Sequence, residues 1–337
     1  MELRVRPASV ALREPLHTAH GTVTERELVA VELEGADGVV GRGEAAALPA
    51  YDGVPVELVR RALDAHAQAV AALPDAATGP EIVDACRAAA DLPQAIAAVD
   101  LALWDRAGRR EGRPVAALLA GEFAAEVEVN ATIGAVDRAG AAEAAAAAAK
   151  AGFGCVKVKV GVGDDAGRVA AVRAAGGPRL ALRLDANGAW SVEEAVSAIE
   201  SLQPAGLELV EEPVHGVAAL RAVRERVGTR VAMDETAAEH GAIGSGATDA
   251  VCLKVARCGG ISATLAAAVL VRTTGAEVYL ASTLDGPLGI AAALHCAAAL
   301  GVSAPCGLAT LGLLEVDDPF PPREGRIAVP TAPGLAP

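Results

Sequence analysis

The feature that most constrains the fold is an alternation of short apolar runs and helical segments that starts near residue 127. The apolar runs have the length and the Val, Leu and Ile content of buried strands, and each precedes a segment of helical periodicity. Sustained to about residue 308, this alternation predicts a parallel α/β barrel or a doubly wound sheet, because parallel neighbours need a crossover helix. The predicted strands are 127–133, 155–160, 180–185, 207–212, 231–235, 250–254, 277–282 and 306–308, and the predicted helices are 137–151, 164–176, 192–202, 216–227, 237–246, 259–273 and 286–300.

The first third of the chain has a different pattern. Residues 2–12 and 27–34 alternate between apolar and polar side chains, as antiparallel strands do, and 39–44 resembles a third strand. Helical periodicity then runs over 56–110, so strands are followed by helices without alternation, which is typical of an α+β unit. The predicted domains are an α+β domain at 1–125, joined by the C-terminal tail 316–337, and a barrel at 126–315.

Two polar loops lie in this first domain. One is His17–Thr22, which includes His20, and the other is Leu48–Gly53, which includes Tyr51. In one interpretation the loops cover a site on the neighbouring domain, and in the other they are ordinary hairpin turns. The residues leave both interpretations open.

The composition excludes several classes of partner. The net charge of −14 argues against nucleic acid and anionic membranes, because phosphate binding requires basic clusters. No run is apolar enough to span a bilayer, and no signal-peptide pattern is present. The six cysteines form no C-x-x-C pair and mostly lie in apolar segments, which indicates buried thiols in a reducing cytoplasm. We expect a cytoplasmic protein whose partners are a small molecule and, in a homo-oligomer, further copies of the chain.

Lysine is rare, and its positions are informative. Of the 29 Lys and Arg residues only four are lysine, and two of these, Lys157 and Lys159, lie in an apolar run. Side chains two apart on a strand point to the same face, so both ammonium groups project together. A third, Lys254, ends another apolar run. A buried lysine can act as a base, whereas arginine stays charged. The alternative is that these side chains extend from strand ends into water.

Acidic residues follow the neighbouring strands. Asp185, Glu211 and Asp234 end three successive predicted strands, 26 and 23 residues apart. In a barrel these ends meet at the mouth where active sites lie, and three carboxylates there would repel one another without a cation. Oxygen-only ligation favours Mg²⁺ over zinc, with Mn²⁺ as an alternative. Each acid could instead cap the following helix, but that leaves the flanking lysines unexplained.

In this order, these motifs resemble the enolase superfamily and its muconate lactonizing enzyme subgroup. The matching elements are Lys157-x-Lys159, Asp185-Ala186-Asn187, Glu211-Glu212-Pro213, Asp234-Glu235-Thr236 and Lys254. Three further segments are similar to actinobacterial o-succinylbenzoate synthases, namely Leu253-Lys254-Val255-Ala256-x-x-Gly259-Gly260, Ser282-Thr283-Leu284-Asp285-x-x-Leu288-Gly289-Ile290-Ala291 and Cys306-Gly307-Leu308. No Asp-x-Asp follows the last strand, where dipeptide epimerases carry one, and no histidine ends the seventh, where mandelate racemases carry their second base.

The resemblance implies a (β/α)-barrel of the modified TIM type with an N-terminal α+β capping domain, acting as a magnesium-dependent lyase on a small carboxylate. It implies that Lys159, beside Lys157, removes a proton α to a carboxylate and then protonates the departing hydroxide, while Lys254 holds the enediolate. The implied reaction is o-succinylbenzoate synthesis in menaquinone biosynthesis. N-acyl amino acid racemase, dipeptide epimerase and muconate cycloisomerase are the alternatives, because related racemases share the lysines. The expected substrate contacts and supporting residues are Asn187, Glu212, Glu235, Ser282, Thr283, Asp285, Gly307, Leu308, His20 and Tyr51.

Two unrelated classes compete with this interpretation. Gly161-x-Gly163-x-x-x-Gly167 follows a strand, as the fingerprint of an NAD-dependent dehydrogenase does, but its last glycine is one position late. Lys157 and Lys159 would also be buried in the central strand of that fold, which is costly. A non-catalytic barrel that binds a small anion would require neither a metal nor poised lysines.

Overall fold

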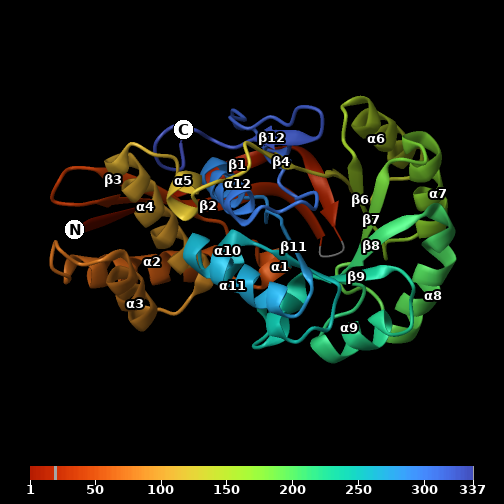
Figure 1. Cartoon of the computed structure of the whole chain (residues 1–337), viewed down its shortest axis with the longest axis horizontal. Helices are drawn as coiled ribbons and strands as arrows, with labels where there is room; N and C mark the ends of the chain where they lie inside the picture. Colours follow the sequence, from red (N-terminus) through yellow and green to blue (C-terminus); the bar gives the residue numbers. More distant parts are fainter. Residues whose placement is uncertain (19–20, 337) are drawn as a thin grey trace.

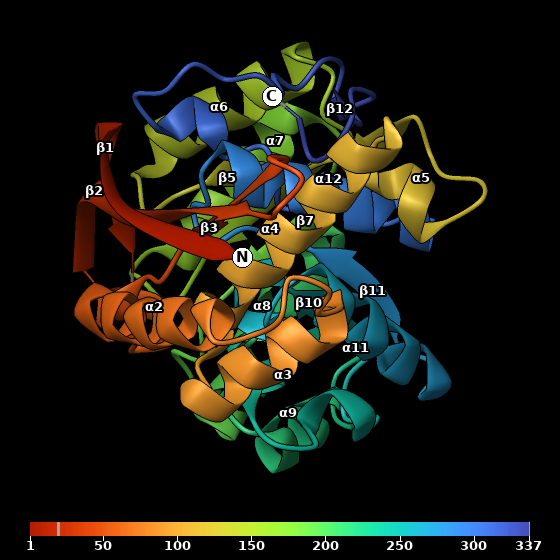
Figure 2. The ribbon, with the colours of Figure 1, turned by 90° about the vertical axis from the view of Figure 1, so that its left-hand side faces the viewer.

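The structure, a computed structural model, describes residues 1–18 and 21–336 and places an N-terminal cap domain beside a curled parallel sheet (Figure 1). In the cap, β1 (Glu2–Thr18), β2 (Gly21–Glu34) and β3 (Val40–Ala45) form an antiparallel sheet in that order. The cap helices are α1 (Pro49–Asp52), α2 (Val56–Ala71), α3 (Gly79–Ala89), α4 (Pro93–Glu111) and α5 (Val115–Leu119). Figure 2 faces the cap and shows α2 and α3 in front of the barrel elements.

Alternation along β2 builds the core of the cap. Val29, Val31 and Leu33 point to one face and are buried against α2 and α4. α4 approaches β3 so closely that a Cβ at Gly43 would lie 2.0 Å from the carbonyl oxygen of Ala98. This packing fixes the end of β3, and with it the start of the segment that carries α1.

The second part of the chain is a parallel sheet in the order β11-β10-β9-β8-β7-β6-β5. Its strands are β5 (Ala131–Ile133), β6 (Cys155–Lys159), β7 (Ala181–Asp185), β8 (Leu207–Glu211), β9 (Arg230–Met233), β10 (Ala250–Leu253) and β11 (Glu277–Leu280). The helices between and after them are α6 (Arg138–Lys150), α7 (Asp165–Gly176), α8 (Val192–Leu202), α9 (Val217–Arg224), α10 (Val255–Cys258), α11 (Ile261–Thr273) and α12 (Pro287–Leu300). Figure 1 shows α6 to α9 on the outer side of β6 to β9. The predicted α/β barrel with an α+β cap is confirmed.

A short segment around Cys306 and Gly307 joins the two edges of this sheet. The Gly307 amide donates to the carbonyl of Leu280 on the β11 edge (2.8 Å), and the Asn130 amide, next to the β5 edge, donates to the carbonyl of Cys306 (3.0 Å). The predicted strand at 306–308 is therefore reduced to isolated bridges. Pro305 has no amide hydrogen to donate, which shortens the pairing at its start.

The predicted helix at 237–246 is wrong. Two 3₁₀ segments, η2 (Glu235–Ala238) and η3 (Ala242–Gly244), occupy this part of the chain. Gly241 and Gly246 adopt positive φ angles of 78° and 63°, which interrupt a helix. A helix is therefore absent between β9 and β10, and a cavity of about 410 Å³ lies there against α11.

Other boundaries differ by a few residues. β1 and β2 extend to Thr18 and from Gly21, so most of the predicted loop at 17–22 is strand. The second predicted loop contains the short helix α1. The strand predicted at 127–133 is split into β4 (Glu126–Glu128) and β5, because β4 pairs outside the barrel with β12 (Arg326–Ala328).

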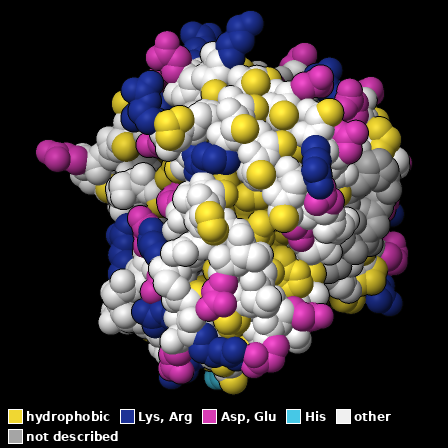
Figure 3. Space-filling model, turned by 90° about the vertical axis from the view of Figure 1, so that its right-hand side faces the viewer, with side chains coloured by type: hydrophobic (Ala, Val, Ile, Leu, Met, Phe, Trp, Pro, Cys, Tyr) yellow, Lys and Arg dark blue, Asp and Glu magenta, His cyan; other side chains and the backbone are white. Residues whose placement is uncertain are grey.

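The C-terminal tail runs back along the cap. The Gly334 amide donates to the carbonyl of Arg113 (3.0 Å), and the Leu335 amide donates to Asp105 Oδ1 (2.7 Å). No helix among residues 1–18 and 21–336 combines the length and hydropathy needed to cross a membrane. Figure 3 shows acidic and basic side chains interspersed over the face that it presents.

Candidate active site

The carboxyl ends of β6, β7 and β8 bring three charged side chains into line. Lys159 pairs in register with Asp185, and Asp185 pairs with Glu211. Paired residues of a parallel sheet point to the same face, so all three project together toward the barrel mouth. Lys157 lies one layer lower on the same face of β6, because side chains two apart share a face.

The lysines form a dense network with these carboxylates. Lys157 Nζ lies 2.8 Å from Asp185 Oδ2 and 2.7 Å from Glu211 Oε1. Lys159 Nζ lies 2.6 Å from Asp185 Oδ2 and 2.7 Å from Asn187 Oδ1. On the other side of the mouth, Lys254 pairs with both carboxylate oxygens of Asp234. The three predicted lysines and three predicted acids thus meet in one place.

Burial makes these charge pairs interdependent. Asp185 and Glu211 are fully buried, and Asp234 is 3% exposed. Burial alone would lower the pKa of Lys157, but Asp185 and Glu211 raise it well above its ordinary value. Burial likewise opposes the charge on Lys254, yet Asp234 raises its pKa. In the opposite direction, burial raises the pKa of Asp234 but Lys254 lowers it to about 2.

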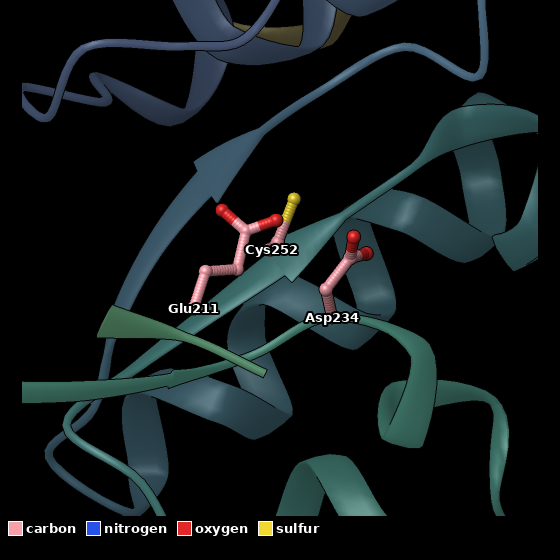
Figure 4. A group of neighbouring side chains, drawn as sticks. All are labelled: Glu211, Asp234 and Cys252. Atoms are coloured by element: carbon pink, nitrogen blue, oxygen red, sulfur yellow. The ribbon is translucent and has the colours of Figure 1, made fainter. Parts of the chain in front are cut away.

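The acidic group fits a hard divalent cation. Ligand atoms of Glu211, Asp234 and Cys252 lie within 4.8 Å of one another, and Figure 4 shows the three side chains pointing to the same side of the sheet. Burial raises the pKa of the Cys252 thiol well above its ordinary value, so the sulfur stays protonated and is a poor ligand. Asp185 completes a set of three carboxylates, since Lys157 contacts both it and Glu211. Oxygen donors alone suit Mg²⁺ or Mn²⁺.

Two supporting residues hold strained backbone conformations at the strand ends. Asn187 and Glu212 have φ angles of 46° and 38°, which non-glycine residues rarely adopt. Asn187 donates to Glu235 Oε1 (2.8 Å) besides contacting Lys159. Glu212 accepts the backbone amide of Asp234 at 2.7 Å. These two residues therefore position Lys159 and Asp234. The pKa of Glu235 is raised to about 8, mainly by burial and next by the negative charge of Asp234.

The cap reaches into this network through Tyr51. Its hydroxyl donates to Asp234 Oδ1 (2.8 Å) and accepts hydrogen bonds from Lys254 (2.6 Å) and Arg257 (2.8 Å). Its ring lies 4.4 Å from Lys254 Nζ and 4.9 Å from the Arg257 guanidinium carbon. Arg257 was not predicted from the sequence, although an arginine one helical turn after Lys254 in an apolar segment was a usable signal.

A cavity of about 170 Å³ opens above the lysines. Its lining includes Tyr51, Asn187, Ser282, Thr283 and Gly307 among the predicted contacts, together with Val23, Leu48, Ala50, Thr132, Gly134, Ala281, Leu284, Thr310 and Leu313. Its charged lining residues in the described part of the chain are Lys157, Lys159, Asp185, Asp234 and Lys254.

The remaining predicted contacts lie elsewhere. Asp285 is buried beside the cavity and accepts hydrogen bonds from Thr283. Leu308 is buried in the core, and Glu212 and Glu235 lie behind the lining residues. His20 lies outside the described residues.

Comparison with known families identifies both parts of the chain. Residues 1–120 match the N-terminal domain of the mandelate racemase / muconate lactonizing enzyme family, and residues 140–336 match the enolase C-terminal domain-like family. The chain belongs to the enolase superfamily. The predicted resemblance to its muconate lactonizing enzyme subgroup is confirmed.

Similar enolase superfamily members perform more than one reaction. The hydrophobic dipeptide epimerase of Enterococcus faecalis is 32% identical over 309 residues, which cover 88% of this chain and 86% of the relative. The o-succinylbenzoate synthase of Thermobifida fusca is 41% identical over 216 residues, covering 60% of this chain and 66% of the relative. A crystal structure of the Enterococcus faecalis V583 dipeptide epimerase, complexed with Mg and L-Leu-L-Tyr, superimposes with a TM-score of 0.89 at 30% identity, covering 99% of this chain and 98% of that one.

Proposed function

We propose that this superfamily member removes a proton from the carbon α to a substrate carboxylate and eliminates water to form o-succinylbenzoate, a step of menaquinone biosynthesis. The observation that carries the proposal is that Lys159 and Lys254 approach one cavity from opposite walls. Three strands, β7 to β9, separate β6 from β10, so their ends face each other across the mouth. A carboxylate bound between them has an amine on either side of its α carbon.

The steps follow from the positions of the side chains. Acting as the base, Lys159 Nζ accepts the α proton, and the C–H electron pair moves into the enediolate. The Lys254 ammonium stabilises the negative charge that develops on the carboxylate oxygens. The enediolate then expels the β hydroxyl group, to which Lys159 returns the proton, so that water leaves from the same face. Held by Asp185, Glu211 and Asp234, Mg²⁺ or Mn²⁺ would supply further positive charge at the carboxylate oxygens.

The charge of the cavity supports a substrate that carries only negative groups. The o-succinylbenzoate precursor is such a substrate, whereas a dipeptide also brings an ammonium group that requires a carboxylate partner. The segment at the last strand position, Cys306-Gly307-Leu308-Ala309-Thr310, contains no acid. Burying an ammonium group without a partner there would cost several kcal/mol.

Racemisation or epimerisation is the second candidate. The same position of Lys254 opposite Lys159 would let it return a proton to the other face of the enediolate. The dipeptide epimerase of Enterococcus faecalis also matches more of the chain than the o-succinylbenzoate synthase of Thermobifida fusca does.

A panel of three substrates and two variants tests the proposal. The unmodified enzyme should dehydrate the o-succinylbenzoate precursor faster than it racemises N-acyl amino acids or epimerises dipeptides. Lys254→Arg keeps a positive charge but does not deprotonate near neutral pH and so cannot act as an acid or base, which means that it should retain measurable dehydration and lose racemisation. Lys254→Ala should be slower than Lys254→Arg, since removing a charge stabiliser typically costs about 10²–10³ in rate. Fast racemisation by the unmodified enzyme, with both variants inactive on the precursor, would favour the second candidate instead.

A further inference from the structure

Beneath the carboxylates, the barrel interior holds two large buried side chains. Arg183 on β7 points to the same face as Asp185, two residues on, but lies one layer deeper. Tyr279 lies on β11, an edge strand of the sheet, and both side chains are almost completely buried. An arginine and a tyrosine at this depth require specific polar partners.

The guanidinium of Arg183 is held on three sides. Its Nε and Nη2 donate to the two carboxylate oxygens of Glu208 at 2.9 and 2.8 Å, and its Nη1 donates to the carbonyl of Pro305 at 2.7 Å. Glu208 is the extra residue at a register shift, because Leu182 pairs with Leu207 but Arg183 pairs with Leu209. A bulge of this kind redirects a side chain.

The clamped guanidinium in turn supports Tyr279. Its central carbon lies 5.1 Å from the centre of the tyrosine ring, within the range of a cation–π contact. The Tyr279 hydroxyl donates to Glu211 Oε2 at 2.7 Å. The other oxygen of that carboxylate, Oε1, contacts Lys157. Glu211 Oε2 is therefore hydrogen-bonded to Tyr279 in the barrel interior, whereas Oε1 lies on the side of Lys157, which also contacts Asp185.

We propose that Tyr279 is a positioning residue for cation binding, which rests on the proposed role of Glu211 as a metal ligand. Its hydroxyl fixes Glu211 Oε2 so that Oε1 stays directed at the cation, and the Glu208–Arg183 clamp holds the ring in place. Without the hydroxyl, Glu211 can rotate about its side-chain bonds, and Oε2 loses its donor in a buried position. Partners of this kind, behind a metal ligand, typically contribute about 10–100-fold to metal affinity.

Tyr279→Phe is the direct test, because it keeps the ring and its contact with Arg183 but removes the hydroxyl. Titration of the metal-free protein with Mg²⁺ alone, followed by calorimetry, should give a dissociation constant about 10–100-fold higher than that of the unmodified protein. At saturating Mg²⁺, the kcat of Tyr279→Phe should be reduced by a smaller factor than its Mg²⁺ affinity, since the hydroxyl acts through Glu211. Glu277→Gln is the matched control: it changes β11 two residues earlier, where Glu277 pairs with Arg230, and should leave Mg²⁺ affinity unchanged.

The outcomes separate this inference from the proposed function. Equal Mg²⁺ affinity in Tyr279→Phe and the unmodified protein overturns the role of Tyr279 and leaves the lyase proposal standing. If the unmodified protein does not bind Mg²⁺, both are overturned. If Tyr279→Phe does not fold, Glu208→Gln replaces it, because weakening the clamp should also reduce Mg²⁺ affinity, and an unchanged affinity in that variant overturns the inference.

Discussion

The hydroxyl of Tyr51 donates a hydrogen bond of 2.8 Å to Asp234 Oδ1, joining α1 of the cap to the carboxylate that follows β9 of the barrel. The Tyr51 hydroxyl oxygen also accepts a hydrogen bond from Lys254, which pairs with Asp234. The position of the cap is therefore coupled directly to one of the three lysines that line the cavity. A second link is the Thr283 hydroxyl, which lies 3.2 Å from the carbonyl of Ala46.

Removing the Tyr51 hydroxyl should weaken catalysis without unfolding the protein. Tyr51→Phe keeps the ring against Lys254 and Arg257 but deletes the hydrogen bonds to Asp234 and to both cations. Hydrogen bonds to charged groups contribute about 1.5–3 kcal/mol, so kcat/KM on the preferred substrate should fall by about 10–100-fold. Steady-state kinetics measure the change, with circular dichroism as the check on folding. An unchanged kcat/KM would show that the cap contact does not affect the lysine.

Neutralising Asp185 should abolish both metal binding and turnover. Asp185→Asn keeps the volume of the side chain but removes a charge that Lys157 and Lys159 both contact. We expect loss of calorimetric Mg²⁺ binding and loss of activity beyond about 10²-fold, with the far-ultraviolet circular dichroism retained. Asp137→Asn is the control, since Asp137 caps α6 and is not among the residues that line the cavity, and asparagine caps helices equally well. Full activity after exhaustive chelation would contradict the metal requirement.

His295 should make the fold sensitive to acid. It is buried in α12, accepts the Ala116 amide at Nδ1 (3.1 Å) and lies 3.3 Å from the Leu335 carbonyl at Nε2. Burial lowers its pKa to about 4, against about 6.5 in the unfolded chain. The folded state thus binds fewer protons between these values, so this contribution to stability is present above pH 6.5 and is lost as the pH falls toward 4. The loss should amount to a few kcal/mol at most.

Urea unfolding of the unmodified protein and of His295→Gln between pH 7.5 and about 4.5 tests this expectation. The variant should be less stable at pH 7.5 and should lose less stability on acidification. Parallel pH profiles for the two proteins would refute it.

Glu44 should have the opposite effect. It lies on β3, accepts the Leu288 amide of α12 at Oε2 (3.3 Å), and its Oε1 has no hydrogen-bond partner among the described residues. Burial, and then Asp285, raise its pKa to about 7. A raised pKa in the folded state means that its contribution is fully present below about pH 4.5 and is lost as the pH rises through 7. Glu44→Gln should therefore flatten the decline in stability that Glu44 causes between about pH 4.5 and 7, measured by urea unfolding across this range. An unaltered slope between these pH values would contradict the assignment.

Parts of the site were predictable because they depend on local pattern. The period of two along β6 puts Lys157 and Lys159 on one face, and consecutive parallel strands bring Asp185 and Glu211 beside them. Gly241 and Gly246 lie within the predicted helix 237–246, and their positive φ angles interrupt it. The absence of an α-helix there does not displace Asp234 or Lys254, because β9 and β10 still end at the same edge.

The sequence by itself determined the strand–helix alternation and the charges at the strand ends, since these follow from periodicity and composition over a few residues at a time, and the order of its motifs indicated the superfamily by resemblance. Only the tertiary structure decided that Tyr51 contacts Asp234, that Arg257 joins them, and that Tyr279 supports Glu211. These contacts span separations such as the 183 residues between Tyr51 and Asp234. They depend on the register of the strands, on a bulge at Glu208 and on the packing of the cap against the barrel. Such geometry results from the packing of the whole chain, so no local pattern encodes it.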